Sequence, residues 1–144
     1  MKGGLLMKDY TPEFIEFAAE IENLIRDTRG KGIEHCALSQ ISRSSTSIFA
    51  NFAESQRAMT AADVRNKIAI ASKEAYETKA WIHFIHKIRF IDDESFTHLD
   101  KWITDILLAL DACTSETMTD KNPTDHMKMM NKIQGNKTWG KGWR

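Results

Sequence analysis

A row of hydrogen-bonding side chains occupies residues 40–54, and its members recur every three or four positions: Gln40, Arg43, Ser47, Asn51 and Glu54. At about 100° per residue, this spacing places all five side chains on one side of a helix. Guanidinium, amide and carboxylate groups in such a row can hold a neighbouring helix or a ligand through charge-assisted hydrogen bonds. They do not supply the acid, base and nucleophile of an enzyme site.

Two carboxylates further along the chain are the natural partners of this row. If the chain reverses around residues 58–59, Arg43 lies level with Glu74, and Gln40 lies level with Glu77. An Arg–Glu pair beside an apolar core fixes the register of two helices more reliably than it adds stability. We therefore interpret the row as a packing and register device, with a ligand or RNA contact as the alternative.

Other reactive residue types do not form a convincing site. His83 and His86 could both reach one metal ion, but no carboxylate or cysteine stands at a helpful local spacing. His35 and Cys36 are adjacent, and sequence neighbours rarely have the geometry of a nucleophile and its base. The serines within residues 42–47 lack the strand-turn-helix context of a hydrolase, and no glycine-rich phosphate loop is present. The sequence predicts no enzyme, no metal and no cofactor.

The composition favours one intracellular domain. The 144 residues carry 20 basic and 20 acidic groups, and zero net charge gives no support to general binding of nucleic acid or membranes. Cys36 and Cys113 are expected to be buried thiols in a reducing cytoplasm. The first seven residues lack the apolar core of a signal peptide, and the longest apolar run, Ile106–Leu110, is too short to cross a bilayer. We expect a soluble, cytoplasmic protein without membrane contact.

Four helices must position these side chains. The first is expected over about residues 12–29. The second begins between residues 34 and 39 and ends near residue 57, the third covers about residues 61–89, and the fourth runs from residue 93 to about 117. Thr11 and Thr60 are suited to cap two of them. Each helix carries an apolar stripe at spacings of three and four. The stripes are Phe14, Ala18, Ile21, Ile25 and Thr28; Ile41, Ser44, Ile48 and Phe52; Val64, Ile68, Ala71, Ala75, Ile82 and Ile85; and Phe96, Leu99, Ile103, Ile106, Leu110 and Cys113.

Short connections between the helices predict antiparallel neighbours and an all-α, up-and-down four-helix bundle. The bundle is expected over residues 11–117, after a lead of residues 1–10. A polar, basic tail follows over residues 118–144, and Met127–Ile133 could form a short helix within it.

The third predicted helix has a second stripe, which consists of Ile70, Glu74, Glu77, Trp81, Phe84 and Ile88. A helix with two such stripes usually touches two neighbours. A lone bundle leaves part of this surface uncovered, so Trp81, Phe84 and Ile88 are expected to form an interface between copies of the chain.

Charge is unevenly distributed along the chain. Residues 58–90 hold six basic and three acidic groups. Residues 91–117 hold one basic and seven acidic groups, and the tail holds six basic and two acidic groups. A molecule with one acidic and one basic face can pack head to tail into a ring, and the alternative is that the basic tail folds across the acidic fourth helix.

Some basic and aromatic residues are candidates for nucleic-acid binding. Lysines neutralise phosphates and tryptophans stack on bases. The nucleic-acid candidates are therefore Arg65, Lys67, Lys73, Lys79, Lys87 and Arg89, with Lys137, Trp139, Lys141, Trp143 and Arg144 in the tail.

The segment QISRSSTSIFANFAE at residues 40–54 resembles the signature of the 23S rRNA intervening-sequence proteins, which reads approximately Q-I-x-R-[SA]-x-x-S-I-x-A-N-x-A-E-[GA]. The segment ASKEAYET at residues 71–78 is similar to the family's pattern of small residues and spaced glutamates. Phe49 stands where many relatives have proline, and Ser55 where glycine is common. The matched motif positions are Gln40, Arg43, Ser44, Ser47, Asn51, Glu54, Glu74 and Glu77.

This resemblance implies a four-helix bundle, and several members of the family assemble as homopentameric rings. Related accessory proteins of diversity-generating retroelements form similar pentamers that bind a reverse transcriptase and its RNA. Members are not known as enzymes. The resemblance therefore implies a non-enzymatic, ring-forming adaptor that binds RNA or a nucleic-acid enzyme such as a reverse transcriptase. The alternative is an oligomeric scaffold with protein partners only.

Overall fold

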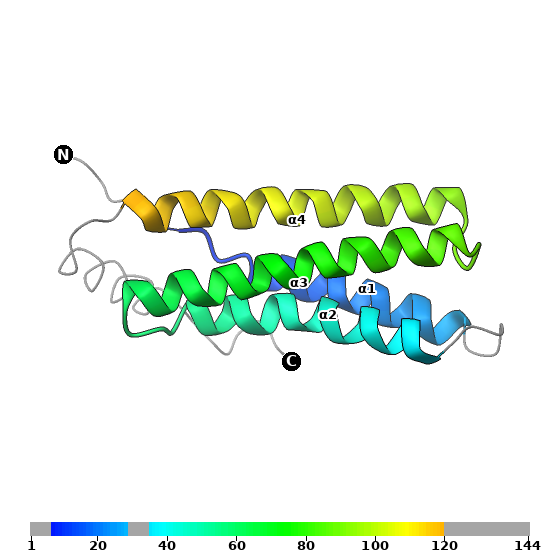
Figure 1. Ribbon diagram of the computed structural model, residues 1–144, viewed down its shortest axis with the longest axis horizontal. Helices are drawn as coiled ribbons and strands as arrows, with labels where there is room; N and C mark the ends of the chain where they lie inside the picture. The colour runs from blue at the N-terminus through cyan, green and yellow to red at the C-terminus, as the bar shows by residue number, and fades with distance from the viewer. Residues whose placement is uncertain (1–6, 29–34, 120–144) are drawn as a thin grey trace.

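The computed structural model describes residues 7–28 and 35–119, and within those ranges it contains four helices and no strand. The helices are α1 (Thr11–Thr28), α2 (His35–Ser55), α3 (Ala61–Lys87) and α4 (Asp93–Thr119). They lie alongside one another in an elongated bundle (Figure 1). The predicted all-α bundle is confirmed, and the helices begin and end close to the expected residues.

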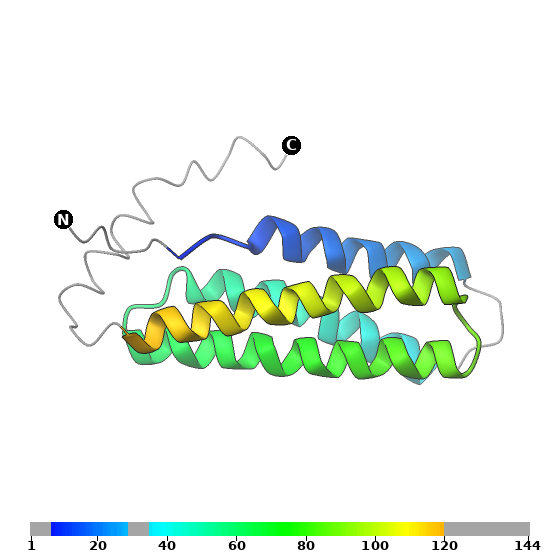
Figure 2. The same ribbon diagram turned by 90° about the horizontal axis from the view of Figure 1, so that it is seen from above.

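Consecutive helices run in opposite directions along the bundle (Figures 1 and 2). The contacts between α2 and α3 follow this order, because Arg43 meets Glu74 whereas Glu54, later on α2, meets Lys67, earlier on α3. Helix α3 packs extensively against both α2 and α4, and α1 packs mainly against α2. Helix α3 therefore has neighbours on two sides.

The helix ends are fixed by local hydrogen bonds. The hydroxyl of Thr60 accepts a hydrogen bond from the backbone N–H of Asp63, as predicted for a cap. Thr11 is instead the first residue of α1, and its own N–H and hydroxyl both donate to the carboxylate of Asp9. After α3 the backbone of Arg89 adopts a φ of 60°, a left-handed conformation that turns the chain toward α4.

The predicted apolar stripes meet in one core. Thr28 lies outside the described side chains, and all of the other members are buried except Phe96, which is half-buried. Phe14 meets Phe52 edge-on, with 5.0 Å between ring centroids. Phe17 was not among the predicted stripe members, but it is fully buried and its ring lies edge-on to Trp102 of α4, with 5.5 Å between ring centroids. Phe17 stands three residues after Phe14 and widens the same apolar surface. Among the described helices, none combines the length and apolarity that a membrane crossing needs.

The two cysteines lie in different environments. Cys113 is buried in the core as expected, and burial raises the pKa of its thiol to about 12. Cys36 is exposed, so the expectation of two buried thiols is wrong for this residue. It lies in the first turn of α2, four residues before Gln40, and therefore continues the polar row and not the core stripe.

Candidate interaction site between α2 and α3

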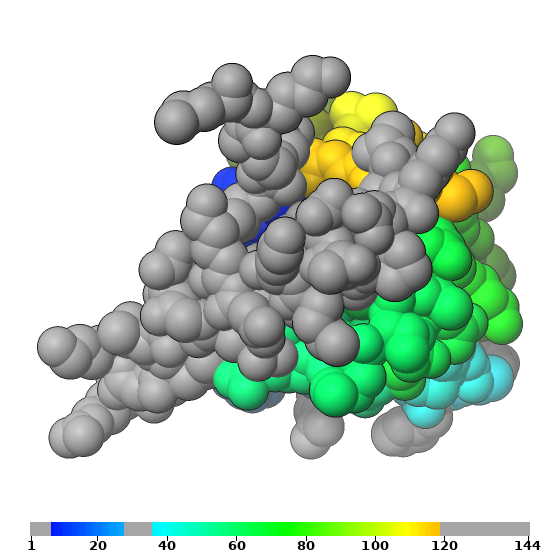
Figure 3. Space-filling model, turned by 90° about the vertical axis from the view of Figure 1, so that its left-hand side faces the viewer, coloured from blue at the N-terminus to red at the C-terminus, as the bar shows by residue number. Residues whose placement is uncertain are grey.

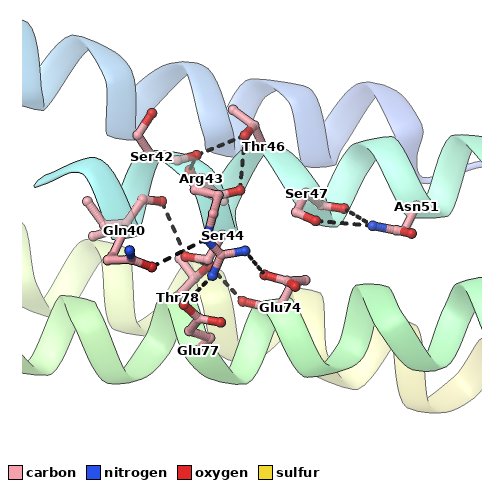
Figure 4. Close-up of polar contacts among 12 residues, drawn as sticks. Gln40, Ser42, Arg43, Ser44, Thr46, Ser47, Asn51, Glu74, Glu77 and Thr78 are labelled. Atoms are coloured by element: carbon pink, nitrogen blue, oxygen red, sulfur yellow. Dashed lines mark hydrogen bonds and ion pairs between the residues drawn. The ribbon is translucent and has the colours of Figure 1, made fainter. Parts of the chain in front are cut away.

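Arg43 is the centre of the polar contacts between α2 and α3 (Figure 4). Its Nη1 lies 3.1 Å from Oε2 of Glu74, its Nη2 donates to Oε1 of Glu77, and its Nε donates to Oε1 of Gln40 at 3.3 Å. One guanidinium therefore spans two carboxylates that lie three residues apart on α3. The planar fork of arginine makes such a double contact possible.

The Arg43–Glu74 pair predicted from the sequence is present, but the predicted Gln40–Glu77 pair is replaced. Gln40 contacts Arg43 of its own helix, and Arg43 reaches Glu77. The side chain of arginine is long enough to reach the next turn of α3, and its charge makes it a stronger partner for a carboxylate than an amide. The positions that lie level on two backbones are thus not always the positions whose side chains meet.

Electrostatics favour ionised groups in this cluster. The pKa of Glu77 lies below its ordinary value, chiefly because Arg43 donates a hydrogen bond to it, and this effect outweighs partial burial. The same hydrogen bond raises the pKa of Arg43. Glu74 is 8% exposed, whereas the side chain of Arg43 is 48% exposed. A buried carboxylate is thus neutralised by a guanidinium that solvent or another molecule can still reach.

A buried hydroxyl pair lies beneath Arg43. The hydroxyl of Thr78 lies 2.8 Å from both Oγ of Ser44 and the backbone oxygen of Glu74. Thr78 and Ser44 are both fully buried, and their small side chains allow α2 and α3 to approach closely. Ser44 was among the predicted positions and Thr78 was not. Thr78 stands four residues after Glu74 and three after Ala75, so its spacing places it next to the core stripe.

The remainder of the polar row is satisfied within the chain. The side-chain amide of Asn51 donates to the backbone oxygen of Ser47 at 2.9 Å and to its hydroxyl at 3.1 Å. The carboxylate of Glu54 forms an ion pair with Lys67 of α3. These contacts fit the packing and register interpretation of the row.

An apolar surface continues from Glu77 toward the C-terminal end of α3. The indole N–H of Trp81 donates to Glu77 at 3.4 Å, and the ring is only partly buried against the core. Phe84 lies edge-on to Trp81 at 5.6 Å. The exposed fractions of Phe84 and Ile88 are 44% and 46%, which is large for side chains of this kind. Their own chain therefore leaves much of this surface uncovered.

The nucleic-acid candidates divide into paired and exposed groups. Lys67 is paired with Glu54, and Lys79 lies 2.9 Å from Asp100 and 2.7 Å from the hydroxyl of Thr104. The exposed candidates are Lys73, Lys87 and Arg89, and Arg65 is half-buried. The tail candidates lie outside the described residues, and they are Lys137, Trp139, Lys141, Trp143 and Arg144.

The histidines of α3 belong to its contact with α4. His83 lies 2.8 Å from Asp100, and His86 lies 2.7 Å from Asp93. The two imidazoles flank Phe96, with ring centroids 4.9 Å and 4.0 Å away. In the part of the chain that the structure describes, no group of three or more His, Cys, Asp or Glu side chains is placed to hold a metal ion. The histidines are therefore explained by packing between α3 and α4.

Comparison with known proteins assigns this chain to a family. Residues 11–112 match the family of the 23S rRNA-intervening sequence proteins. A solved structure from Bacteroides thetaiotaomicron VPI-5482, a protein of unknown function from the S23 ribosomal protein family, is 33% identical, with a TM-score of 0.70. That similarity covers 73% of this chain and 94% of the other. No curated protein matches the sequence. Since the family match covers α1 to α3 and most of α4, the chain belongs to the 23S rRNA-intervening sequence protein family.

Proposed function

We propose that this protein works by binding and not by catalysis, as a self-associating helical adaptor for RNA or for an enzyme that acts on RNA, such as a reverse transcriptase. The observation that carries the proposal is the exposed apolar surface formed by Trp81, Phe84 and Ile88. These side chains recur at spacings of three and four, so they line one side of α3. A second copy of the chain can cover them.

The energy of covering this surface supports self-association. Fully burying a side chain such as phenylalanine or isoleucine contributes about 1.5–3 kcal/mol, and Phe84 and Ile88 each have almost half of their surface still to bury. Several copies of this contact in a closed ring add together. The Arg43, Glu74 and Glu77 cluster lies beside the apolar surface, and its one guanidinium and two carboxylates leave a net charge of −1. An interface that extends over the cluster is therefore favourable where the neighbouring copy supplies a cation.

A ring with unlike contacting faces, such as the homopentamer that the family resemblance implies, fits the charge distribution. In a head-to-tail ring one face of each copy meets a different face of the next copy. The exposed cations Lys73, Lys87 and Arg89 lie on α3 or directly after it, whereas Glu16 and Glu20 are exposed on α1. Opposite signs on different helices favour contacts between unlike faces over contacts between like faces.

Variants at the apolar surface test self-association. We expect Phe84→Asp, alone and with Ile88→Asp, to convert the assembly to a monomer with an unchanged helical circular dichroism spectrum. Met59→Asp is the matched control, because Met59 is 78% exposed at the turn between α2 and α3. The readout is the sedimentation coefficient at micromolar concentration. Phe84→Asp protein that sediments like the wild type would contradict the proposal.

RNA is the favoured partner because a repeated set of exposed cations can neutralise several phosphates at once. We expect a structured RNA to bind the wild type with an affinity that falls steeply as salt is raised. Replacing Lys73, Lys87 and Arg89 with alanine should lower the slope of log affinity against log salt. The control is Lys101→Ala, since Lys101 forms its ion pair with Asp105 of the same helix. Binding that is absent at low salt, or indifferent to salt, would exclude phosphate-led recognition.

A scaffold with protein partners only is the second candidate. Two of the basic residues of α3, Lys67 and Lys79, are neutralised within the chain, and the net charge is zero. Affinity capture from lysate before and after nuclease treatment separates the two candidates. Partners lost on treatment support the RNA adaptor, and partners that survive it support the scaffold.

A further inference from the structure

We infer that the basic tail, residues 120–144, docks in its own chain on an exposed ridge of α4. The ridge consists of Asp105, Leu108, Asp111, Ser115 and Met118. Successive members are three or four residues apart, so they share one side of the helix. This inference does not depend on self-association or on RNA binding.

The ridge combines exposed apolar side chains with carboxylates. Leu108 is 63% exposed and Met118 is 65% exposed, so the ridge presents two large apolar side chains to solvent. Asp111 is exposed between them, and no ion pair joins it to any other described residue. Asp105 is also exposed, and its contact with Lys101 lies on the same helix.

A neighbouring side chain of α3 extends the apolar surface. Lys79 of α3 meets Thr104 of α4, so Tyr76, three residues before Lys79, comes level with Leu108, four residues after Thr104. Tyr76 is 58% exposed. The ridge and Tyr76 together present apolar surface bordered by negative charge, which suits a segment that is both basic and aromatic.

The tail has the matching composition. From residue 120 onward it carries Lys121, Lys128, Lys132, Lys137, Lys141 and Arg144 against two aspartates, with Trp139 and Trp143 near its end. A tryptophan ring can cover Leu108 or Met118 while a lysine beside it meets Asp105 or Asp111. The positive charge of the tail therefore complements the carboxylates of α4, whereas the exposed cations of α3 would repel it.

Distance favours docking within the chain. The tail starts directly after α4, at the end of the bundle where α2 also turns into α3 (Figure 3). Leu108 lies about 15 Å back along the helix axis from Met118. Residues 120–144 can span roughly 80 Å when extended, several times that distance. A tethered segment experiences a local concentration on the order of millimolar, so modest contacts are sufficient.

Limited trypsin digestion of the full chain at low salt tests this inference. Cleavage after Lys128, Lys132, Lys137 and Lys141, quantified by mass spectrometry, reports access to the tail. We expect Leu108→Ser with Asp111→Asn to speed this cleavage by about fivefold or more, because proteolysis follows the population of the open form. Asp111→Glu, which keeps the charge, should retain the wild-type rate.

Two controls make chemically similar changes elsewhere, namely Glu20→Gln on α1 and Met59→Ser at the turn between α2 and α3, and both should match the wild type. Equal cleavage rates in the wild type and in the Leu108→Ser, Asp111→Asn variant would overturn the inference. If the tail becomes protected only as protein concentration rises, the tail of one copy binds the ridge of another, and this result would also overturn docking within the chain. Phe84→Asp protein should keep a protected tail, which separates this result from the test of self-association.

Discussion

At the scale of single residues, Arg43 carries most of the polar contacts between α2 and α3. Its guanidinium touches Glu74, Glu77 and Gln40 at once, and Glu74 is buried. A carboxylate that is buried without its partner is costly, so the pair specifies which turn of α2 faces which turn of α3. This explains why one exposed arginine can matter to the fold.

Removing Arg43 should therefore destabilise the protein. We expect Arg43→Ala to lower the free energy of unfolding by about 1–3 kcal/mol, because Glu74 loses its charged partner. Arg43→Lys should cost less, since a lysine keeps one of the contacts. Arg26→Ala on α1 is the control, and it should change stability by less than about 0.5 kcal/mol. Urea denaturation provides the measurement, and an Arg43→Ala protein as stable as the control would contradict this role.

Glu77 should give the stability a defined dependence on pH. Its ordinary pKa is 4.5, and the hydrogen bond from Arg43 lowers the pKa in the folded state. A carboxyl with a lowered folded pKa stabilises the protein above its unfolded pKa, and this contribution is lost as pH falls through the folded pKa. We expect the wild type to exceed Glu77→Gln in stability at neutral pH, and the difference to shrink below about pH 4.5. A difference that stays constant during acid titration would count against the pairing.

The two thiols should react at very different rates. Cys36 is exposed, whereas Cys113 is buried and its pKa is raised to about 12. Since the thiolate is the reactive form, an aromatic disulfide reagent at mildly alkaline pH should modify Cys36 alone in the folded protein. Denaturant should then expose Cys113 to the reagent, and the Cys36→Ser variant should show no rapid reaction in its folded state. Two rapidly reacting thiols in the native protein would contradict the burial of Cys113.

At the scale of helices, the spacing of apolar residues predicted the fold well. Stripes with members such as Ile21, Ile48, Ile68 and Ile103 identified the buried side of each helix, because helical periodicity alone decides which side chains share a face. The Arg43–Glu74 contact was also predictable, since it needs only the position of the turn between α2 and α3.

Contacts that depend on side-chain reach or on unusual backbone angles were not predictable. The replacement of Gln40 by Arg43 at Glu77 depends on the length of arginine. The contacts of His83 and His86 with α4 depend on how the left-handed Arg89 orients the next helix, and sequence spacing does not reveal that angle. The exposure of Cys36, in contrast, could have been predicted, because this residue stands four positions before Gln40 and so lies on the polar row.

The cap of α3 gives a test at the scale of one helix. Thr60 accepts the N–H of Asp63, which otherwise has no partner within the helix. We expect Thr60→Ala to lower the unfolding free energy by about 1 kcal/mol, and Thr60→Ser to preserve most of it. Thermal or urea denaturation measures both variants. A Thr60→Ser protein as unstable as Thr60→Ala would show that the hydroxyl is not responsible.

At the scale of the whole molecule, the uneven charge along the sequence is partly balanced inside the bundle. Asp100 of α4 meets Lys79 and His83 of α3, and burial that would raise its pKa is outweighed by hydrogen bonds from these two groups. The acidic helix therefore uses some of its charge to hold α3. At the C-terminal end of α3, Phe84 and Ile88 remain exposed beside the partly buried Trp81, and the proposal of an assembly depends on this apolar surface.

The molar mass of the wild-type protein in solution tests this central claim most directly. Light scattering coupled to size-exclusion chromatography, at concentrations from about one to one hundred micromolar, reports that mass without a label. We predict a stable assembly of several copies of the 16.5 kDa chain that persists at the lower concentrations. A monomer throughout this range would show that the surface at Phe84 and Ile88 stays open to solvent, and self-association would be rejected.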